Sequence, residues 1–342
     1  MKKIISLLMM SAVFSTSLLN MYPSASSAEE TKTIRIMSIG DSITDGYSKA
    51  GSYRKFLYND LVKQGYSIDM LGAKGGGWTP TYTDPVTGES FEYDDENTGY
   101  SGYTIQSYNG RNGIYELLVS TDCLSQAPDI VILQIGTNDV IDNHELDTSG
   151  ERLTVLLEYI LEHISPESSL FVTSIPELEP NRQEVYNWFS NYRHDLNDWN
   201  TTYTDDEVEV KVHYAVSKYN NIVQNTVSAL KKKHNNIYLG DINSVITNVS
   251  TQLDDGVHPN DTGYKLMGDY WAKVLSDHLS GGEHIQDNNY TIADAVSLGN
   301  YLLNRKSSIT SENWKRYDVD PDSVLNSFDI ALMLRKMTKY DK

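Results

Sequence analysis

Residues 40–46 read Gly40-Asp41-Ser42-Ile43-Thr44-Asp45-Gly46 and separate two segments of different periodicity. The preceding residues, 34–39, form a mostly apolar run, which predicts a buried strand. The following residues, 53–62, carry apolar side chains at helical spacing, which predicts a helix. We therefore expect Ser42 in a loop at the carboxyl end of a strand, where open α/β sheets build their binding sites.

A serine in such a loop is only weakly diagnostic of catalysis, because small polar residues between glycines are typical of turns. Its hydroxyl becomes a nucleophile when a neighbouring base takes its proton. The segment Asp254-Asp255-Gly256-Val257-His258 offers that base. A carboxylate three residues before a histidine on a tight turn can reach the imidazole Nδ1 and leave Nε2 facing a serine, which favours Asp255 over Asp254. The alternative for His258 is a hydrogen-bonded histidine with a structural role.

Two further motifs offer hydrogen-bond donors. Gly136-Thr137-Asn138-Asp139 follows the apolar run 130–135, so we expect the Asn138 amide at the end of another strand. Gly102 lies in the segment Gly99-Tyr100-Ser101-Gly102-Tyr103, and a glycine allows a backbone N–H to approach a substrate closely. Together with the serine and the histidine, these groups fit acyl transfer through an oxyanion.

In this order the motifs resemble the four blocks of the SGNH (GDSL-type) hydrolases, and the resemblance covers about residues 33–280. It implies that Ser42 attacks an ester carbonyl, with His258 as the base and Asp255 as its partner. It also implies an oxyanion hole formed by the backbone N–H groups of Ser42 and Gly102 and by the Asn138 amide. No cofactor is expected for this chemistry.

Three segments resemble one branch of that superfamily more closely, namely carbohydrate esterase family 3, the acetyl xylan esterases. They are residues 51–54, 99–105 and 255–264. Tyr100 departs from the family pattern, in which a histidine is expected. A long insert near residues 180–212 is a second departure, and both bear on the substrate rather than on the chemistry.

The chain between residues 33 and 280 alternates strand-like and helix-like segments, which predicts a parallel sheet covered by helices on both faces. With the resemblance, the expected fold is the flavodoxin-like three-layer α/β/α SGNH fold. Asp261 or Thr262 is expected to cap the last helix of this domain. The expected strands are residues 34–39, 67–71, 130–135, 170–175 and 237–240, and two of the expected helices are residues 153–161 and 262–279.

The insert at residues 180–212 is rich in aromatic residues, including Tyr186, Trp188 and Trp199. Two interpretations remain open. The rings could form a platform or lid for a sugar, because aromatic rings stack on sugar faces, or they could pack into a small core of the insert itself.

Composition and the N-terminus indicate an exported protein. Lys2, Lys3 and the short apolar run that follows them, with small residues before position 29, predict a signal peptide at residues 1–28 and a secreted, extracellular product.

The formal net charge of −19 disfavours nucleic acid and anionic lipid as partners, and the N-terminal apolar run is too short to insert across a membrane. Cys123 is the single cysteine, so no intrachain disulfide is expected, and we expect it to be a buried filler.

A short linker at residues 280–283 separates the esterase domain, residues 29–280, from a C-terminal segment, residues 281–342. This segment contains two helical patterns, which begin near Asp294 and Asp329. Before the second pattern, oxygen-bearing side chains recur at spacings that suit Ca²⁺. The candidate ligands are Asp318, Asp320, Asp322, Asn326 and Asp329, with the Val324 carbonyl.

The second loop and its helix resemble the type I dockerin of cellulosomal enzymes, which implies a small all-α calcium-binding module whose partner is a cohesin on a scaffold protein. The first copy carries Ile285 at a ligand position, so we expect it to bind calcium weakly or not at all. The alternative is an acidic, capped helix start without an ion.

The expected function is hydrolysis of O-acetyl esters of plant cell-wall polysaccharide, acetyl xylan first, by a serine esterase docked on a cellulosome. Two alternatives remain open. One is a lipolytic or aryl esterase of the same superfamily, and the other is a non-catalytic sugar-binding cellulosome subunit.

Overall fold

The computed structural model describes residues 32–76, 79–281, 292–310 and 327–338, together with residues 317, 319 and 325. The expected signal peptide lies outside the described residues. Within them, no helix combines the length and the apolar character that crossing a membrane requires.

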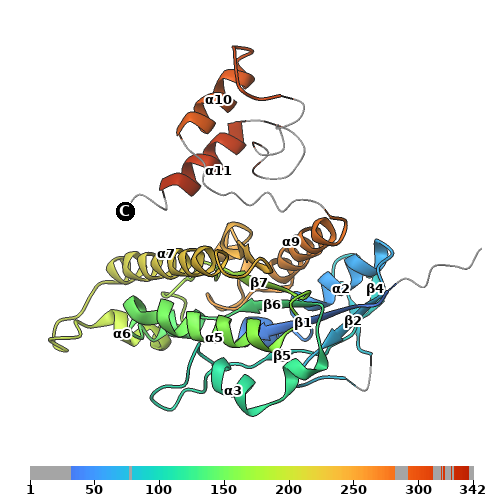
Figure 1. The fold of residues 1–342 in the computed structure, drawn as a ribbon. Coiled ribbons are helices and arrows are strands. Elements are labelled where there is room, and N and C mark those ends of the chain that lie inside the picture. The colour runs from blue at the N-terminus through green and yellow to red at the C-terminus, as the bar shows by residue number, and fades with distance from the viewer. Residues whose placement is uncertain are drawn as a thin grey trace, which may run out of the picture. The chain divides into compact units, whose positions relative to one another are not determined.

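A six-stranded sheet forms the centre of the larger domain (Figure 1). Its order is β2-β1-β6-β7-β8, with the short β5 paired to the end of β1, and all these pairs are parallel. Counted along the chain, the five longer strands follow the flavodoxin-like order 2-1-3-4-5. All five expected strands are confirmed within two residues of their expected ends. Their bounds are β1 Ile34–Gly40, β2 Ile68–Leu71, β5 Thr98–Gly99, β6 Ile130–Gln134, β7 Ser169–Thr173 and β8 Ile237–Gly240.

Both faces of the sheet are buried, because alternate side chains of each strand enter two different cores. Ile36, Ile132 and Phe171 belong to the core beneath α2 (Arg54–Lys63) and α9 (Asp261–Leu279). Met37 and Val131 belong to the core on the other face. That second core lies beneath α3 (Ile114–Ser120), α5 (Ser149–His163) and α7 (Asp205–Leu230), of which α5 and α7 lie side by side (Figure 1). The central strands therefore read as apolar runs.

Several elements were not expected from the sequence. A hairpin of β3 (Thr81–Thr83) and β4 (Ser90–Glu92) covers part of α2, where Phe56 contacts Tyr82 and Phe91. The long helix α7 begins inside the supposed insert. Its start is a capping box, in which Thr204 accepts from the Glu207 N–H and the Glu207 carboxylate accepts from the Thr204 N–H. This signal was present in the sequence.

Two local expectations were wrong. Ser42 is not in an open loop, since it is the first residue of the one-turn helix α1 (Ser42–Asp45), which Asp41 caps by accepting from the Ile43 N–H. The cap of α9 is Asn260, whose side chain accepts from the Gly263 N–H at 3.1 Å. Asp261 is already helical and its carboxylate lies 3.4 Å from Lys55 Nζ, so it cannot serve as the cap.

Smaller elements complete the larger domain. Cys123 is buried there, as expected, and is a free thiol. The helical elements are α4 Thr137–Ile141, α6 Ser190–Arg193, α8 Val249–Gln252 and the 3₁₀ helices η1 Cys123–Gln126, η2 Leu146–Thr148, η3 Tyr186–Phe189 and η4 Ile242–Ser244.

The C-terminal segment contains two helices, α10 (Ile292–Leu302) and α11 (Ser327–Thr338), at the two helical patterns. They share a small core that includes Leu298 and Met333, both fully buried. Of the five proposed calcium ligands, only Asp329 is among the described residues. Asp318, Asp320, Asp322 and Asn326 lie outside them, as does the loop that carries Ile285.

Candidate active site

Three side chains from two distant parts of the chain form one hydrogen-bonded line. His258 Nε2 lies 2.8 Å from Ser42 Oγ, and His258 Nδ1 lies 2.7 Å from Asp255 Oδ2. Ser42 lies two residues after the end of β1, whereas the other two belong to the loop between α8 and α9. Ser42 and His258 are buried. The arrangement can take the hydroxyl proton onto the imidazole and hold the resulting imidazolium against a carboxylate.

One carboxylate shapes the turn that carries the histidine. Asp255 Oδ1 accepts from the N–H groups of Val257 at 2.9 Å and His258 at 2.8 Å, while Oδ2 holds the ring. Gly256 has a φ of +94°, a conformation that favours glycine. Burial by itself would raise the pKa of Asp255, but the hydrogen bonds from His258 outweigh it and the pKa is lowered. Asp255 therefore stays ionised and can fix the imidazole tautomer.

The neighbouring acid, Asp254, faces another way. Its carboxylate lies 3.4 Å from Lys49 Nζ, and its backbone N–H donates to the His258 carbonyl at 2.8 Å. The structure thus brings Asp255, and not Asp254, to the imidazole, as the spacing to the histidine predicts.

The expected oxyanion donors come from the loop after β5 and from α4. Asn138 follows β6 and donates one Nδ2 hydrogen to the Tyr103 carbonyl at 2.8 Å, which leaves the second hydrogen for another acceptor. Gly102 has a φ of +82°, and its carbonyl accepts from Arg111 at 3.4 Å. Because β1 and β6 are neighbours whose connections leave in opposite directions, Ser42 and Asn138 meet at the topological switch point of the sheet.

The Gly102 loop is tied to the helix that begins with Ser42. The Tyr100 N–H donates to the Gly40 carbonyl at 2.9 Å, and the Ser101 hydroxyl donates to the Asp45 carboxylate at 2.8 Å. Lys74 also pairs with Asp45, and its ammonium lies 4.7 Å from the centre of the Tyr100 ring. The tyrosine that departs from the family pattern therefore contacts the cation that neutralises Asp45.

Two buried carboxylates beside the expected site residues were missed from the sequence. Asp41 is fully buried, and burial raises its pKa to about 6. Asp139 is also fully buried, and burial likewise raises its pKa to about 6 although it accepts from the Ile105 N–H and pairs with Arg152. Asp41 caps the helix of Ser42, and Asp139 holds the segment that follows Gly102. Their places next to Ser42 and Asn138 in the motifs were the available signal.

Two aromatic rings contact the imidazole. The ring centroids of Tyr47 and His258 lie 4.4 Å apart, and those of Trp188 and His258 lie 5.9 Å apart with the planes at 80°. Trp188 belongs to η3 in the insert, so this part of the insert borders the site. Other rings of the insert, such as Phe189 and Tyr192, are buried in the core of the whole domain rather than in a separate core of the insert.

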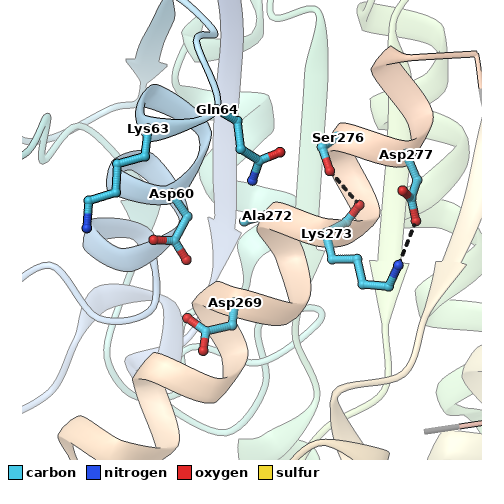
Figure 2. A pocket seen from close by; sticks show the side chains of 8 residues that line it. All are labelled: Asp60, Lys63, Gln64, Asp269, Ala272, Lys273, Ser276 and Asp277. Atoms are coloured by element: carbon cyan, nitrogen blue, oxygen red, sulfur yellow. Dashed lines mark hydrogen bonds and ion pairs between the residues drawn. The ribbon is translucent and has the colours of Figure 1, made fainter. Parts of the chain in front are cut away.

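Further grooves lie away from these side chains. A polar groove of about 440 Å³ lies between α2 and α9 (Figure 2). Burial and the nearby Asp269 raise the pKa of Asp60 in this groove. A second pocket, of about 580 Å³, lies between the insert and α7 and is lined by Tyr203 and Tyr214, among others. Neither pocket includes Ser42, Asp255 or His258. The groove in Figure 2 is lined by Asp60, Lys63, Gln64, Asp269, Ala272, Lys273, Ser276 and Asp277.

The described residues contain one group of three carboxylates close enough to share an ion, Asp69, Asp94 and Glu96. Asp69 already pairs with Arg35, and Asp94 accepts from the N–H groups of Met70 and Glu96. Two of the three carboxylates therefore have protein partners of their own.

The family of the chain follows from a comparison with sequence families. The sequence model of the GDSL-like lipase/acylhydrolase family matches residues 36–271, a span that includes Ser42, Gly102, Asn138, Asp255 and His258. The chain belongs to this family. It has the SGNH fold of that family, built around a central parallel sheet.

Three proteins similar to this GDSL-type hydrolase illustrate the comparison. The hydrolase is 34% identical over 331 residues to a multidomain esterase of Ruminococcus flavefaciens. The aligned region is 94% of this chain but only 37% of that longer protein. The hydrolase is 26% identical to the family 3 carbohydrate esterase of Clostridium thermocellum, and the two structures superpose with a TM-score of 0.51. The match covers 73% of this chain and 98% of the esterase. The fold is shared by a family 3 carbohydrate esterase of Talaromyces cellulolyticus, which is 18% identical and has a TM-score of 0.50. The match covers 72% of this chain and 99% of that protein.

Proposed function

We propose that this GDSL-type hydrolase is a secreted carbohydrate esterase that removes O-acetyl groups from plant cell-wall polysaccharide, with acetyl xylan as its substrate. The observation that carries the proposal is the hydrogen-bonded line from Asp255 through His258 to Ser42. The similarity to a family 3 carbohydrate esterase supports the class of substrate.

In the proposed reaction, Ser42 Oγ attacks the acetyl carbonyl while His258 Nε2 takes the hydroxyl proton. The N–H groups of Ser42 and Gly102 and the Asn138 amide stabilise the negative oxygen. Collapse of the intermediate breaks the ester bond, and His258 gives its proton to the departing sugar oxygen. A water, deprotonated by His258, then attacks the acetyl-serine, releases acetate and restores Ser42.

The test is acetate release from acetylated xylans, mannans and pectins, together with p-nitrophenyl esters from acetate to octanoate. We expect acetyl xylan to be the best polysaccharide and acetate the best acyl group, and we expect Ser42→Ala to lose activity on all of them. A preference for octanoate would move the protein to the lipolytic class. Sugar binding without hydrolysis of any ester would make it a non-catalytic subunit.

We further propose that residues 281–342 form a dockerin, which binds a cohesin on a scaffold protein. This dockerin would hold Ca²⁺ through Asp318, Asp320, Asp322, Asn326 and Asp329. Two observations support it. The helices α10 and α11 share a core, and the buried Asp329 carboxylate accepts from the Val319 N–H at 2.6 Å, which draws residues of the loop to the start of α11. The all-oxygen donor set is the kind that Ca²⁺ prefers.

A further inference from the structure

The segment before α7, residues 179–193, is bonded to two parts of the active site, the turn that carries His258 and the helix that carries Asn138. On one side, the Glu179 N–H donates to the Gly256 carbonyl at 2.8 Å and Arg182 Nη2 donates to the Asp254 carbonyl at 2.7 Å. These bonds join the segment to the turn of Asp255 and His258. On the other side, the Tyr192 hydroxyl donates to the Val140 carbonyl at 2.6 Å, and Val140 belongs to α4, the helix of Asn138.

The same segment is braced internally by a buried arginine. Arg193 donates to the carbonyls of Tyr186 at 3.0 Å and Pro180 at 2.7 Å, and its guanidinium lies 3.2 Å from the centre of the Tyr186 ring. Phe189 is fully buried, which fixes the end of η3 in the core. These contacts fix the backbone of η3, which carries Trp188, before any substrate arrives.

Trp188 and Tyr47 keep large exposed areas although they border buried groups. Trp188 is 40% exposed and Tyr47 is 47% exposed, whereas the His258 side chain between them is 4% exposed. Tyr47 lies directly after α1, where its N–H donates to the Ser42 carbonyl at 3.0 Å. The two rings thus cover the imidazole and present apolar area to solvent beside the nucleophile.

The chemistry of the reaction places the alcohol of the ester next to these rings. His258 Nε2 must deliver its proton to the departing oxygen, so the group that carries this oxygen lies within hydrogen-bonding reach of the imidazole. The walls beside the imidazole are the Tyr47 and Trp188 rings. A pyranose has an apolar face of C–H groups, which suits contact with an aromatic ring, whereas its hydroxyl edges stay in water.

From this geometry we infer that Tyr47 and Trp188 form a subsite for the sugar ring that carries the acetyl ester. The inference rests on the proposed function and adds the residues that select a sugar as the alcohol. Trp188 supplies one wall, on a segment that is bonded both to the turn of His258 and to the helix of Asn138. Tyr47 supplies the other wall, because its N–H is bonded to the Ser42 carbonyl.

The test compares two alcohols in one enzyme, an acetylated xylo-oligosaccharide, which has a ring, and ethyl acetate, which has none. For Trp188→Ala we expect the KM of the oligosaccharide to rise about tenfold, which corresponds to about 1.4 kcal/mol of binding, with a smaller change in kcat. The loss in kcat/KM on ethyl acetate is expected to be several-fold smaller. Trp188→Phe, which keeps a ring, is expected to restore most of the KM.

Trp199→Ala is the matched control, because Trp199 lies in the same insert and is 56% exposed but stacks on His194 rather than His258. Both substrates are expected to be turned over by this variant as by the wild type. Equal losses of Trp188→Ala on both substrates would mean that Trp188 only supports His258, and would overturn the subsite. An unchanged KM for the oligosaccharide would overturn it as well. A wild type that hydrolyses ethyl acetate but no acetylated saccharide would instead overturn the proposed function, and the subsite with it.

Discussion

At the scale of single residues, the two oxygens of Asp255 have separate partners. Oδ1 accepts from two backbone N–H groups and sets the shape of the turn, whereas Oδ2 accepts from the imidazole and sets its tautomer. The adjacent Asp254 has the same charge but directs it to Lys49. Replacing each aspartate in turn therefore distinguishes the effect of a negative charge near the site from the effect of a carboxylate that orients the imidazole.

We expect Asp255→Asn to lower kcat by about 10³- to 10⁴-fold, since an amide can favour the wrong imidazole tautomer. Asp254→Asn loses only a partly exposed ion pair and is expected to stay within a few-fold of the wild type. Steady-state kinetics on p-nitrophenyl acetate measures both. Similar losses, or a larger loss for Asp254→Asn, would contradict the assignment of Asp255 as the orienting acid.

A second residue-scale prediction concerns the buried Asp41, whose pKa burial raises to about 6 in the folded chain. An unfolded aspartate ionises near pH 3.9, so the folded state holds its proton longer than the unfolded state. This contribution is fully present below about pH 4 and is lost as the pH rises to about 6. Between pH 4 and 7, the free energy of unfolding of the wild type should fall by about 2 kcal/mol relative to Asp41→Asn.

Denaturant unfolding of both proteins at several pH values measures this difference. Glu89→Gln, at an exposed position, serves as the control and should track the wild type at every pH. A difference between wild type and Asp41→Asn that does not change with pH would show that Asp41 ionises as freely in the folded chain as in the unfolded one.

At the scale of elements, α4 connects the oxyanion side of the site to α5. Asn138 and Asp139 are neighbours on α4, and both hold the segment 103–105 through backbone atoms. Asp139 also pairs at 3.3 Å with Arg152 of α5, whose side chain is mostly buried. A single carboxylate thus fixes the Gly102 loop and the packing of two helices.

We expect Asp139→Ala to lower the free energy of unfolding by about 3–5 kcal/mol, because it leaves Arg152 charged and without its partner in a buried place. Adding Arg152→Leu removes that charge, so the double variant should recover part of the loss. Urea unfolding of the two single variants and the double variant gives the coupling energy. If the losses in free energy of unfolding of the two single variants add up to the loss of the double variant, the ion pair does not hold α4 to α5.

At the scale of the whole molecule, the esterase domain and the C-terminal helices have separate hydrophobic cores. The triad, the proposed oxyanion donors and the two aromatic walls all lie within residues 42–258. On the proposed function, the C-terminal segment contributes to location and not to catalysis. Metal binding by its acidic loop should be coupled to its folding, since four carboxylates would otherwise repel one another.

A chain that ends at Ser280 should therefore keep full activity on small soluble esters. In the full chain, Asp318→Ala with Asp320→Ala should abolish calcium binding and binding to a cohesin, whereas activity on p-nitrophenyl acetate stays at the wild-type level. Calorimetric titration with Ca²⁺ and a chelation assay provide the measurements. A loss of esterase activity on chelation would contradict the separation of the two functions.

Much of this molecule follows from local patterns in the chain. The five longer strands appear where apolar runs predict them, because a sheet buried on both faces needs apolar side chains at nearly every position. The three side chains that form the hydrogen-bonded line, Ser42, His258 and Asp255, were also identifiable as candidates, since their motifs have short fixed spacings and the order of the motifs matches a family. The start of α7 was readable in the same way from its capping box, although the surrounding insert concealed it.

The tertiary structure alone decided the features that depend on residues far apart in the sequence. The pKa values of Asp41 and Asp139 rise because the fold removes water from them, and no local pattern records that burial. Asp261 pairs with Lys55, which is 206 residues away in the sequence, while Asn260 caps α9. Trp188 and Trp199 are the same residue type in one insert, and only the bonds that anchor η3 to the site place one of them beside His258. Local sequence thus determined which chemistry the chain carries, and long-range packing determined which side chains surround it.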